Sequence, residues 1–572
     1  MTGARIRVWA PRPDRVDLVV GGERRAMEPE DGGWWASADV LPAGTDYAFS
    51  LDGGPSRPDP RSPWQPHGIH GPSRTVDHAA FDWTDAGWDA PPLADAVIYE
   101  AHVGTFSPEG TFDGAISRLD AIVDLGVTHL ELMPVAEFGG ARGWGYDGVD
   151  LFAPHDAYGG PDGLKRLVDA AHSRGLAVLI DVVYNHLGPA GNYLSEFGPY
   201  FSTKYATPWG AAVNFDEAGS HEVRRFVVDH ALHWLRDYHA DGLRIDAMQA
   251  ILDMSAIHIG EEIATAVHGL GEALGRRLVV TAESDLNDPR LVRPPRVGGY
   301  GMDAVWADDV HHALHAALTG ETAGYYADFA APDALPRSLH DPYLYAGNYA
   351  PSRDRRHGRP AGELPGDRFV ACLQNHDQVG NRALGDRIGQ IASPGRARIG
   401  AALLLIGPYV PLLFAGEEWS ASTPFLYFTD HADPELRRAV RDGRRREFAH
   451  FGWDPESVPD PQDPATFAAS VLDWAERDRE PHAGLLRWYR ELIAVRRELP
   501  ELRDGDRSAV RVTGDATSLL QVVRGRVRIA ANLGPEPAEV AITGQVRLAW
   551  PADVLSDRGL LLPPDGVIIT VG

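Results

Sequence analysis

Eight short apolar runs, most of them followed by a helical pattern, constrain the fold of this chain more than any other feature. The runs begin near residue 97, and the segments between them carry the spacing of amphipathic helices. Strands that alternate with helices form parallel sheets, and eight such units can close into a barrel. We therefore predict an α/β fold centred on a (β/α)8 TIM barrel.

The predicted strands and helices have defined positions in the chain. The strand runs are Val97–Tyr99, Thr128–Met133, Ala177–Val183, Gly242–Asp246, Leu278–Glu283, Ala304–Asp308, Phe369–Gln374 and Tyr409–Phe414. The clearest helical patterns are Asp162–Ser173, His221–Tyr238, Ile259–Leu274 and Leu485–Leu499. Between the fifth and sixth runs the sequence has no clear helical pattern, so this is the weakest step of the barrel prediction.

The chain on both sides of the barrel follows a different pattern. In residues 1–90, short alternating runs such as Arg5–Trp9 are separated by Gly-Gly and Pro-rich turns, and Asp85–Asp95 has the composition of a linker. Short alternating strands return after Asp504. For the 572 residues we predict an N-terminal immunoglobulin-like β-sandwich (1–90), a barrel with insertions (95–500) and a C-terminal antiparallel β domain (504–572).

Charge and composition argue against several classes of partner. Acidic residues outnumber basic ones 81 to 54, and the net charge of −27 repels phosphate backbones and anionic lipids. The single cysteine, Cys372, allows no intramolecular disulfide, and the longest apolar stretch, Ala401–Gly416, is too short to span a bilayer. No signal-peptide core stands near the N-terminus. We expect a cytoplasmic protein that binds neither nucleic acid nor membrane, and no feature indicates its oligomeric state.

Polar residues gather where four of the predicted strands end. In a (β/α)8 barrel this edge carries the active site. The clusters are Asp181–His186 after the third run, Arg244–Asp246 in the fourth, Thr281–Glu283 in the fifth and Asn375–Asp377 after the seventh. A single Asp at a strand end is more often a helix cap or a loop salt bridge, but four clusters at one end of a barrel favour a site.

The residue types in these clusters fit the cleavage of a glycosidic bond. Strand alternation puts Arg244 and Asp246 on one face, and an arginine keeps a neighbouring carboxylate ionised. An ionised carboxylate and a second carboxyl that holds its proton are the groups that this reaction needs. The sequence has no G-x-S-x-G elbow, no P-loop and no H-E-x-x-H helix, so other hydrolytic machinery is missing.

At these clusters the chain resembles the α-amylase family, glycoside hydrolase family 13. The matching segments are DVVYNH, GLRID, TAES and QNHD, in the family's order. The resemblance implies Asp246 as nucleophile, Glu283 as general acid/base and Asp377 as the carboxylate that stabilises the transition state, with Arg244, His186 and His376 holding the sugar. It also implies retention of configuration, for which the two reacting carboxyls stand roughly 5 to 5.5 Å apart.

Longer segments are similar to one group of that family, the maltooligosyltrehalose trehalohydrolases. They are residues 142–164, 185–194, 283–292 and 416–436. The resemblance implies hydrolysis of the α-1,4 bond next to the terminal trehalose of maltooligosyltrehalose, with α-1,4-glucan oligosaccharides as related substrates. A branching or debranching enzyme on the same scaffold is the alternative. The chain departs from the family at Met248–Gln249, where a His or a Lys-His pair is common, so contacts with the leaving-group sugar are in question.

Further residues are candidates for substrate binding. By resemblance Tyr146 stacks on the sugar at the cleavage point, with Asp147 beside it. The other candidates are Gln249 after the fourth run, Asp309 and His312 after the sixth, and Gln378 and Asn381 after the seventh. Packing or capping is the alternative role for each. His311 and His315 have the i, i+4 spacing of a metal pair, but no nearby carboxylate or cysteine completes a set, and we expect neither metal nor cofactor.

Overall fold

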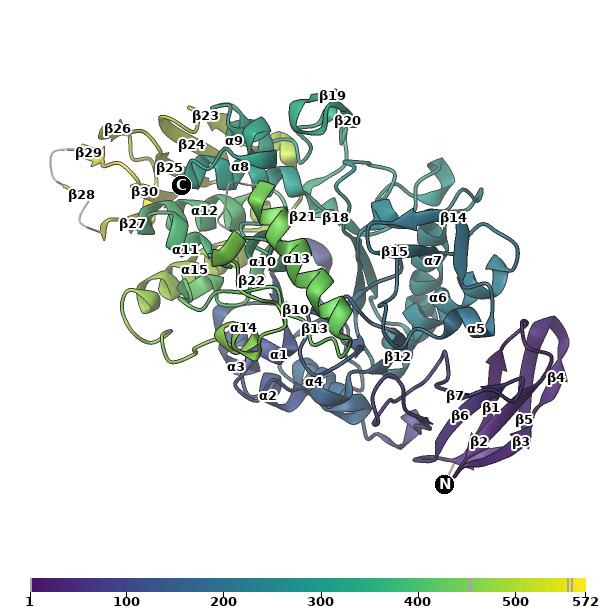
Figure 1. Ribbon diagram of the computed structural model, residues 1–572. Helices are drawn as coiled ribbons and strands as arrows, with labels where there is room; N and C mark the ends of the chain where they lie inside the picture. The colour runs from purple at the N-terminus through teal and green to yellow at the C-terminus, as the bar shows by residue number, and fades with distance from the viewer. Residues whose placement is uncertain (1–2, 451–454, 553–554, 557–558) are drawn as a thin grey trace.

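A closed barrel of eight parallel strands forms the centre of the molecule, as predicted (Figure 1). The computed structural model describes residues 3–450, 455–552, 555–556 and 559–572. The barrel strands are β9 (Ile98–Ala101), β10 (His129–Leu132), β13 (Ala177–Val182), β16 (Gly242–Ile245), β17 (Val279–Ala282), β18 (Ala304–Trp306), β21 (Phe369–Cys372) and β22 (Val410–Phe414). They lie in chain order around the ring, and β22 closes it by pairing with β9.

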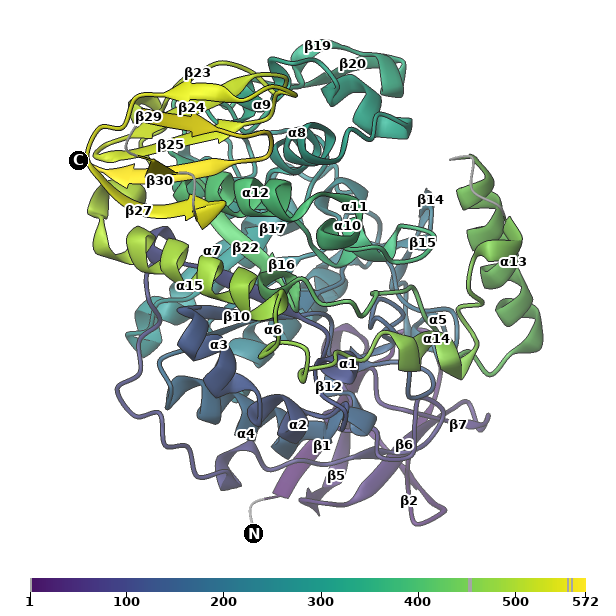
Figure 2. The same cartoon turned by 90° about the vertical axis from the view of Figure 1, so that its left-hand side faces the viewer.

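Helices lie outside the barrel strands (Figure 2). The four predicted helical patterns are confirmed as α4 (Gly160–His172), α6 (Ser220–Asp237), α7 (Ile259–Leu274) and α15 (His482–Glu498). Between β17 and β18 the chain forms only a short 3-10 turn at Pro295–Val297, where the sequence showed no helix. The other helices are α1 (Val103–Phe106), α2 (Phe112–Ile116), α3 (Leu119–Leu125), α5 (Leu194–Phe197), α8 (Asp308–Thr319), α9 (Ala334–Ser338), α10 (His376–Gly380), α11 (Ile388–Ile391), α12 (Pro394–Ile406), α13 (Pro434–His450) and α14 (Pro464–Ala469).

Antiparallel sheets occupy both ends of the chain, at separate places on the barrel (Figures 1 and 2). The N-terminal sheets contain β1 (Gly3–Trp9), β2 (Val16–Val20), β3 (Glu23–Ala26), β4 (Glu28–Glu30), β5 (Trp34–Pro42), β6 (Asp46–Leu51), β7 (Ser56–Arg57) and β8 (Ser73–Arg74). The C-terminal sheets contain β23 (Arg511–Thr513), β24 (Leu519–Arg524), β25 (Val527–Asn532), β26 (Ala538–Val540), β27 (Gln545–Trp550), β28 (Leu555–Ser556), β29 (Gly559–Leu562) and β30 (Val567–Val571). The boundaries proposed for the three domains stay predictions.

Three hairpins project from the barrel loops. They are β11 (Ala136–Glu137) with β12 (Asp150–Pro154), β14 (Phe201–Thr207) with β15 (Gly210–Val213), and β19 (Ala346–Ala350) with β20 (Arg355–Gly358).

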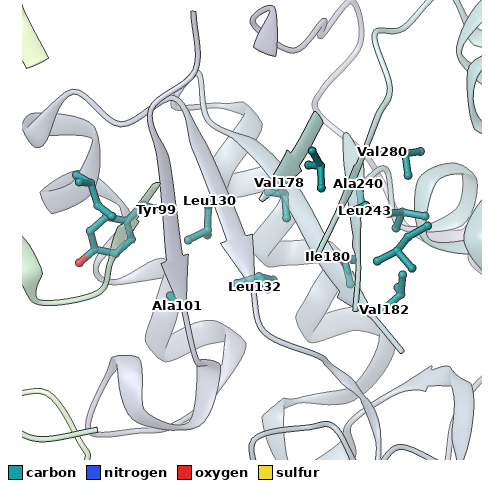
Figure 3. Packing of buried hydrophobic residues seen from close by; sticks show 14 of the residues in the cluster. Tyr99, Ala101, Leu130, Leu132, Val178, Ile180, Val182, Ala240, Leu243 and Val280 are labelled. Atoms are coloured by element: carbon teal, nitrogen blue, oxygen red, sulfur yellow. The ribbon is translucent and has the colours of Figure 1, made fainter. Parts of the chain in front are cut away.

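Strand alternation divides the barrel side chains into an outer and an inner set. Outer side chains such as Leu130, Val178 and Leu243 pack in the large core that also contains helix residues (Figure 3). The inner set is apolar where the strands begin, with Ile98 and Leu179 in a separate cluster. In four strands, β9, β10, β13 and β16, the inner residue nearer the carboxyl end is charged, and these residues are Glu100, Glu131, Asp181 and Arg244. Side chains alternate between the two faces of each strand. The strands that bury apolar residues on the outer face therefore also place these charged residues inside, at one end of the barrel.

The structure also places the cysteine and the longest apolar stretch that the sequence analysis singled out. Cys372 is a free, buried cysteine in the apolar inner cluster. The apolar stretch Ala401–Gly416 is divided between α12 and β22. Within the described residues, none of the helices has the length and apolar character needed to cross a membrane.

Candidate active site

The Arg244 guanidinium is the centre of the charged end of the barrel. The side chain is fully buried, and its Nη1 donates to Asp181 Oδ2 (2.6 Å) and to Asp246 Oδ1 (3.0 Å). Its Nη2 donates to Glu283 Oε2 at 2.5 Å. Carboxylates from β13, from the end of β16 and from the end of β17 thus converge on one cation. Such charge-assisted bonds fix both distance and orientation.

The buried carboxyls of Asp246 and Glu283 both have raised pKa, and their hydrogen-bond partners differ. Burial raises the pKa of both carboxyls, and the Arg244 charge opposes that rise. Asp246 also accepts from Asn185 Nδ2 at 2.9 Å, whereas the charges of Asp246 and Asp377 push the pKa of Glu283 further up, to about 8. When two carboxyl groups lie close together, the negative charge of the first one to ionise raises the pKa of the second. The pKa of about 8 keeps a proton on Glu283 near neutral pH.

The backbone after Asp246 also contacts Glu283. Ala247 has a φ of +40°, a left-handed conformation that is uncommon for residues other than glycine. Its N–H donates to Glu283 Oε2 at 3.1 Å, and the next N–H, of Met248, donates to the Glu283 carbonyl at 2.9 Å. The strained turn thus connects the loops that follow β16 and β17.

His376 is held in its charged form beneath the site. Its Nδ1 and Glu100 Oε1 are 2.5 Å apart, and its backbone N–H donates to Glu100 Oε2 at 2.8 Å. Burial alone lowers the pKa of His376, but the charges of Asp377 and Glu100 and the Glu100 hydrogen bond outweigh it and raise the pKa to about 10. Both ring nitrogens therefore donate near neutral pH.

Tyr146 lies between the histidine and the arginine. Its hydroxyl is 2.8 Å from His376 Nε2 and donates to Asp181 Oδ2 at 2.6 Å, and its ring stacks on that of His376 at a centroid distance of 5.3 Å. Since the hydroxyl accepts from the imidazolium and donates to a carboxylate, the direction of each bond is fixed. These contacts therefore hold the Tyr146 ring in one orientation against His376.

Asp377 is partly exposed, and each of its carboxylate oxygens has a contact. Its Oδ1 accepts from Asn381 Nδ2 at 2.9 Å, and its Oδ2 lies 3.5 Å from His376 Nε2. Asn381 is in turn bonded through its Oδ1 to Arg444 of α13 at 3.0 Å, and the same guanidinium donates to the Gly380 carbonyl at 2.9 Å. About a third of the Asp377 side chain stays exposed, so the carboxylate remains open to a ligand.

His186, Asp147 and two glutamines lie around these groups. His186 is bonded to Asn185 and stacks on the exposed Trp209 of the β14–β15 turn, with centroids 5.3 Å apart. Asp147 Oδ2 is 3.6 Å from His431 Nε2, and its side chain is 37% exposed. Among the residues that the structure describes, the buried side-chain oxygens of Gln249 and Gln378 have no hydrogen-bond partner. Each of these two oxygens therefore keeps an unused capacity to accept a hydrogen bond.

The two candidates after β18 have partners within the protein. Asp309 Oδ2 accepts from Asn287 Nδ2 (2.8 Å), from the N–H of Leu344 (2.7 Å) and from the N–H of Tyr345 (2.9 Å). Burial raises the pKa of Asp309 to about 6 in spite of these bonds. His312 is buried among aromatic rings, the nearest being Tyr325 at 4.8 Å. The structure thus gives both residues a packing or loop-fixing contact, and their contact with substrate stays a prediction.

Several residues of the site were missing from the sequence-based set. Glu100 directly follows the first predicted run, and a polar residue at that position was a usable signal. Asp181 and Asn185 stood inside a recognised cluster without an assigned role. Asp308 precedes Asp309, and burial together with the charges of Glu283, Asp285 and Asp309 raises its pKa. Sequence alone could not tell which of the two adjacent aspartates faces Glu283.

Comparison with known proteins gives this geometry a family. The chain is 51% identical to the malto-oligosyltrehalose trehalohydrolase of Arthrobacter ramosus, over 99% of both chains. It is 48% identical to the enzyme of that name from Mycobacterium tuberculosis (strain CDC 1551 / Oshkosh), over 96% of both chains. The chain belongs to the malto-oligosyltrehalose trehalohydrolase family. It is therefore a glycosidase with the α-amylase type of catalytic barrel.

Two domain models and a solved structure agree with this assignment. Residues 76–206 match the model of the alpha amylase catalytic domain, and residues 505–569 match a domain of unknown function, DUF3459. A crystal structure from Salmonella typhimurium described as a "Putative alpha Amylase" superposes with a TM-score of 0.91 and 39% identity, covering 99% of this chain and 97% of that one. The expected fold class and family are thereby confirmed.

Proposed function

We propose that this member of the family hydrolyses the α-1,4-glucosidic bond next to the terminal trehalose of maltooligosyltrehalose, as a step of trehalose biosynthesis. The products are trehalose and a maltooligosaccharide. The observation that carries the proposal is the contact of both Asp246 and Glu283 with one buried guanidinium, that of Arg244. Burial and the charges of Asp246 and Asp377 raise the pKa of Glu283 to about 8, which keeps a proton on it near neutral pH. The near full-length similarity to enzymes named for this reaction supports the choice of substrate.

In the proposed first step, an Asp246 carboxylate oxygen attacks the anomeric carbon while the bond to the leaving oxygen breaks. Glu283 gives its proton to that oxygen, so trehalose leaves as a neutral alcohol and Asp246 carries a glycosyl ester. In the second step Glu283 takes a proton from water, the water oxygen attacks the same carbon, and the ester bond to Asp246 breaks. Two displacements restore the original configuration.

The other residues of the site are proposed to stabilise the charge of the transition state and to position the sugar. Asp377 is proposed to hold sugar hydroxyls and to stabilise the positive charge that develops on the ring. We assign direct sugar contacts to Arg244, His186, His376, Tyr146, Asp147, Gln249, Gln378 and Asn381. Asp309 and His312 are proposed to act indirectly, because their contacts shape the loops that follow β18.

The proposal is tested by incubating the enzyme with maltooligosyltrehalose and, separately, with plain maltopentaose. We expect free trehalose from the first substrate and much slower hydrolysis of the second, and the Glu283→Gln variant serves as a control of strongly reduced activity. The glucan-transferase alternative is tested in the same experiment with amylose. If amylose gains α-1,6 branches while maltooligosyltrehalose yields no trehalose, the proposed hydrolysis is wrong.

The predicted cytoplasmic location and domain boundaries belong to the same proposal. Cell fractionation tests the location, and limited proteolysis tests whether cuts fall near residues 90–95 and 500–504.

A further inference from the structure

Glu131 is a buried carboxyl of the barrel interior that takes no part in the proposed reaction. It stands on the inner face of β10 and is 1% exposed. In register it pairs with Glu100 of β9 on one side and with Leu179 of β13 on the other. A carboxyl in this position is costly to bury unless its polar atoms find partners.

The surrounding charges keep a proton on Glu131. Burial and the charge of Glu100 raise its pKa well above the ordinary value, and Asp181 adds to the rise. The charges of Arg244 and His376 act in the opposite direction without cancelling it. Glu131 is therefore a neutral acid near neutral pH, and its carboxyl can both donate and accept a hydrogen bond.

Glu131 and Trp306 point into the barrel from opposite walls. In the ring β9, β10, β13, β16, β17, β18, β21, β22, strand β18 stands opposite β10. The Trp306 ring covers one face of the Arg244 guanidinium, whose carbon lies 4.4 Å from the ring centroid. Asp181 pairs in register with Arg244 and is the next inner residue after Leu179, which is level with Glu131. The interior of an eight-stranded barrel is just wide enough for side chains to fill, so these side chains meet there.

Four buried polar atoms of this interior have no hydrogen-bond partner among the residues that the structure describes. They are Glu131 Oε2, Asp181 Oδ1, Arg244 Nε and Trp306 Nε1. The two nitrogens are donors, the Asp181 oxygen is an acceptor, and the protonated carboxyl of Glu131 can be either. A water molecule has two protons and two lone pairs, and buried waters commonly join two to four such groups.

We propose that Glu131 is a positioning residue of the active site, joined by one bound water to Asp181 Oδ1 and Arg244 Nε. Trp306 Nε1 donates to the same water. The apolar inner cluster that includes Ile98 lies where the strands begin and separates this water from the other end of the barrel.

The water acts on the reaction through the Arg244 guanidinium. Its Nη1 and Nη2 hold Asp246 at 3.0 Å and Glu283 at 2.5 Å, and Nε is the remaining nitrogen by which the plane of the group can be fixed. The charge of Arg244 lowers the pKa of Glu283, so a loosened guanidinium leaves that pKa higher and Glu283 a weaker acid. The inference rests on the proposed hydrolysis, because Asp246 and Glu283 are the groups that Arg244 orients.

The test removes the hydrogen bonds of this water and leaves the reacting carboxyls in place. Glu131→Leu removes the polar group at nearly constant volume, and Glu131→Gln restores a neutral donor and acceptor. Trp306→Phe removes the Nε1 donor and keeps an aromatic ring over Arg244. Leu132→Val is the matched control, because Leu132 is the next residue of β10 and packs in the outer core (Figure 3). For each variant, kcat and KM for maltooligosyltrehalose are measured across pH, and urea unfolding gives the stability.

We expect Glu131→Leu to lower kcat about tenfold with little change in KM, because small displacements of catalytic groups are costly. The alkaline decline of kcat/KM should move upward from pH 8 by about half a pH unit. Glu131→Gln should recover at least about half of the wild-type kcat, since it can bond the same water. Trp306→Phe should move the decline in the same direction by a smaller amount. Leu132→Val should lower stability without moving the pH profile.

The proposal is wrong if the pH profile of Glu131→Leu coincides with that of the wild type, or if Glu131→Gln is as impaired as Glu131→Leu. A purely structural role would scale the activity equally at every pH. Where Glu131→Leu does not fold, an unshifted profile of Trp306→Phe overturns the proposal.

A crystal structure of the wild type tests the water itself. It should show one water within about 3.2 Å of Glu131, Asp181 and Arg244, and an interior in which these groups have no common water overturns the link. A wild type that releases no trehalose overturns the proposed hydrolysis instead, and the crystal structure then still decides whether the water is present.

Discussion

The ends of barrel strands β17 and β22 both carry buried carboxyl groups with raised pKa, but the two ends differ in the partners of those groups. After β17, burial and neighbouring charges raise the pKa of Glu283 to about 8. After β22, burial raises the pKa of Glu417 to about 8 and that of Glu418 to about 7. A raised pKa alone therefore does not distinguish the two regions.

The partners and the exposure of these carboxyls do distinguish them. Glu283 contacts a guanidinium that it shares with Asp246, and 17% of its side chain is exposed. Glu417 is bonded to the Tyr489 hydroxyl at 2.9 Å and Glu418 to the Tyr99 hydroxyl at 3.0 Å, and both are at most 2% exposed. The proposed acid is thus the carboxyl that is partly accessible and that shares a cation with a second carboxyl. The Glu417–Glu418 pair instead connects β22 to α15 and β9.

The largest effect is expected for Asp246→Ala. Without the nucleophile no glycosyl ester forms, and we expect kcat to fall on the order of 10⁴-fold or more, as for other residues that act as a unit. Affinity for maltooligosyltrehalose should persist, since the aromatic and histidine contacts remain. Calorimetry with substrate and a trehalose-release assay measure the two quantities. A variant that retains a tenth of the wild-type rate would remove Asp246 from its role.

Glu283→Gln should lower kcat by roughly 10² to 10⁴, the usual contribution of a general acid. In the wild type, kcat/KM should fall as pH rises through about 8, because the free enzyme then loses the proton that the leaving oxygen needs. The residual activity of the variant should lack this alkaline decline. A wild-type profile that stays flat from pH 6 to pH 10 would contradict the assigned proton.

Glu417→Gln should change stability and leave kcat unchanged. The folded pKa of about 8 lies above the ordinary 4.5. The folded state therefore keeps a proton that the unfolded chain loses, and the free energy of unfolding of the wild type falls as pH rises from 4.5 to 8. The slope in this window is about 1.4 kcal/mol per pH unit at most. The variant has no proton to lose at this position, so urea unfolding should find it less sensitive to pH.

Glu418→Gln is the matched control for that prediction. The pKa of Glu418 is about 7, so the pH range over which this residue lowers the free energy of unfolding is narrower than for Glu417. Above pH 8, Glu418→Gln should therefore gain less stability over the wild type than Glu417→Gln. If either variant loses activity as Glu283→Gln does, the contrast between the two strand ends fails.

The sequence was sufficient for the barrel and for the charged end, because both follow from the period of two in buried strands. Arg244 and Asp246 could be assigned to one face, and the structure brings their side chains within 3.0 Å. The partner of His376 was missed because Glu100 lies 276 residues away, at the start of the barrel. Asp309 was a candidate from the sequence, but its carboxylate is bonded to Asn287, Leu344 and Tyr345. These contacts depend on how α8 begins after β18, which residue spacing does not show. Contacts such as that between His376 and Glu100 depend on which distant strands pair in the barrel.

The smallest effect concerns α13, whose Arg444 bonds the loop that carries Asp377. We expect Arg444→Ala to lower kcat by about threefold to tenfold, because Asn381 loses the contact that orients it toward Asp377 and small displacements of a catalytic group are costly. Arg441→Ala on the same helix is the control, since Arg441 bonds its neighbour Asp442. Arg444→Lys should recover part of the rate, because a lysine reaches only one of the two acceptors. Equal rates for the Arg444 and Arg441 variants would mean that α13 covers the loop without positioning Asp377, and the catalytic end of the barrel would then be complete without it.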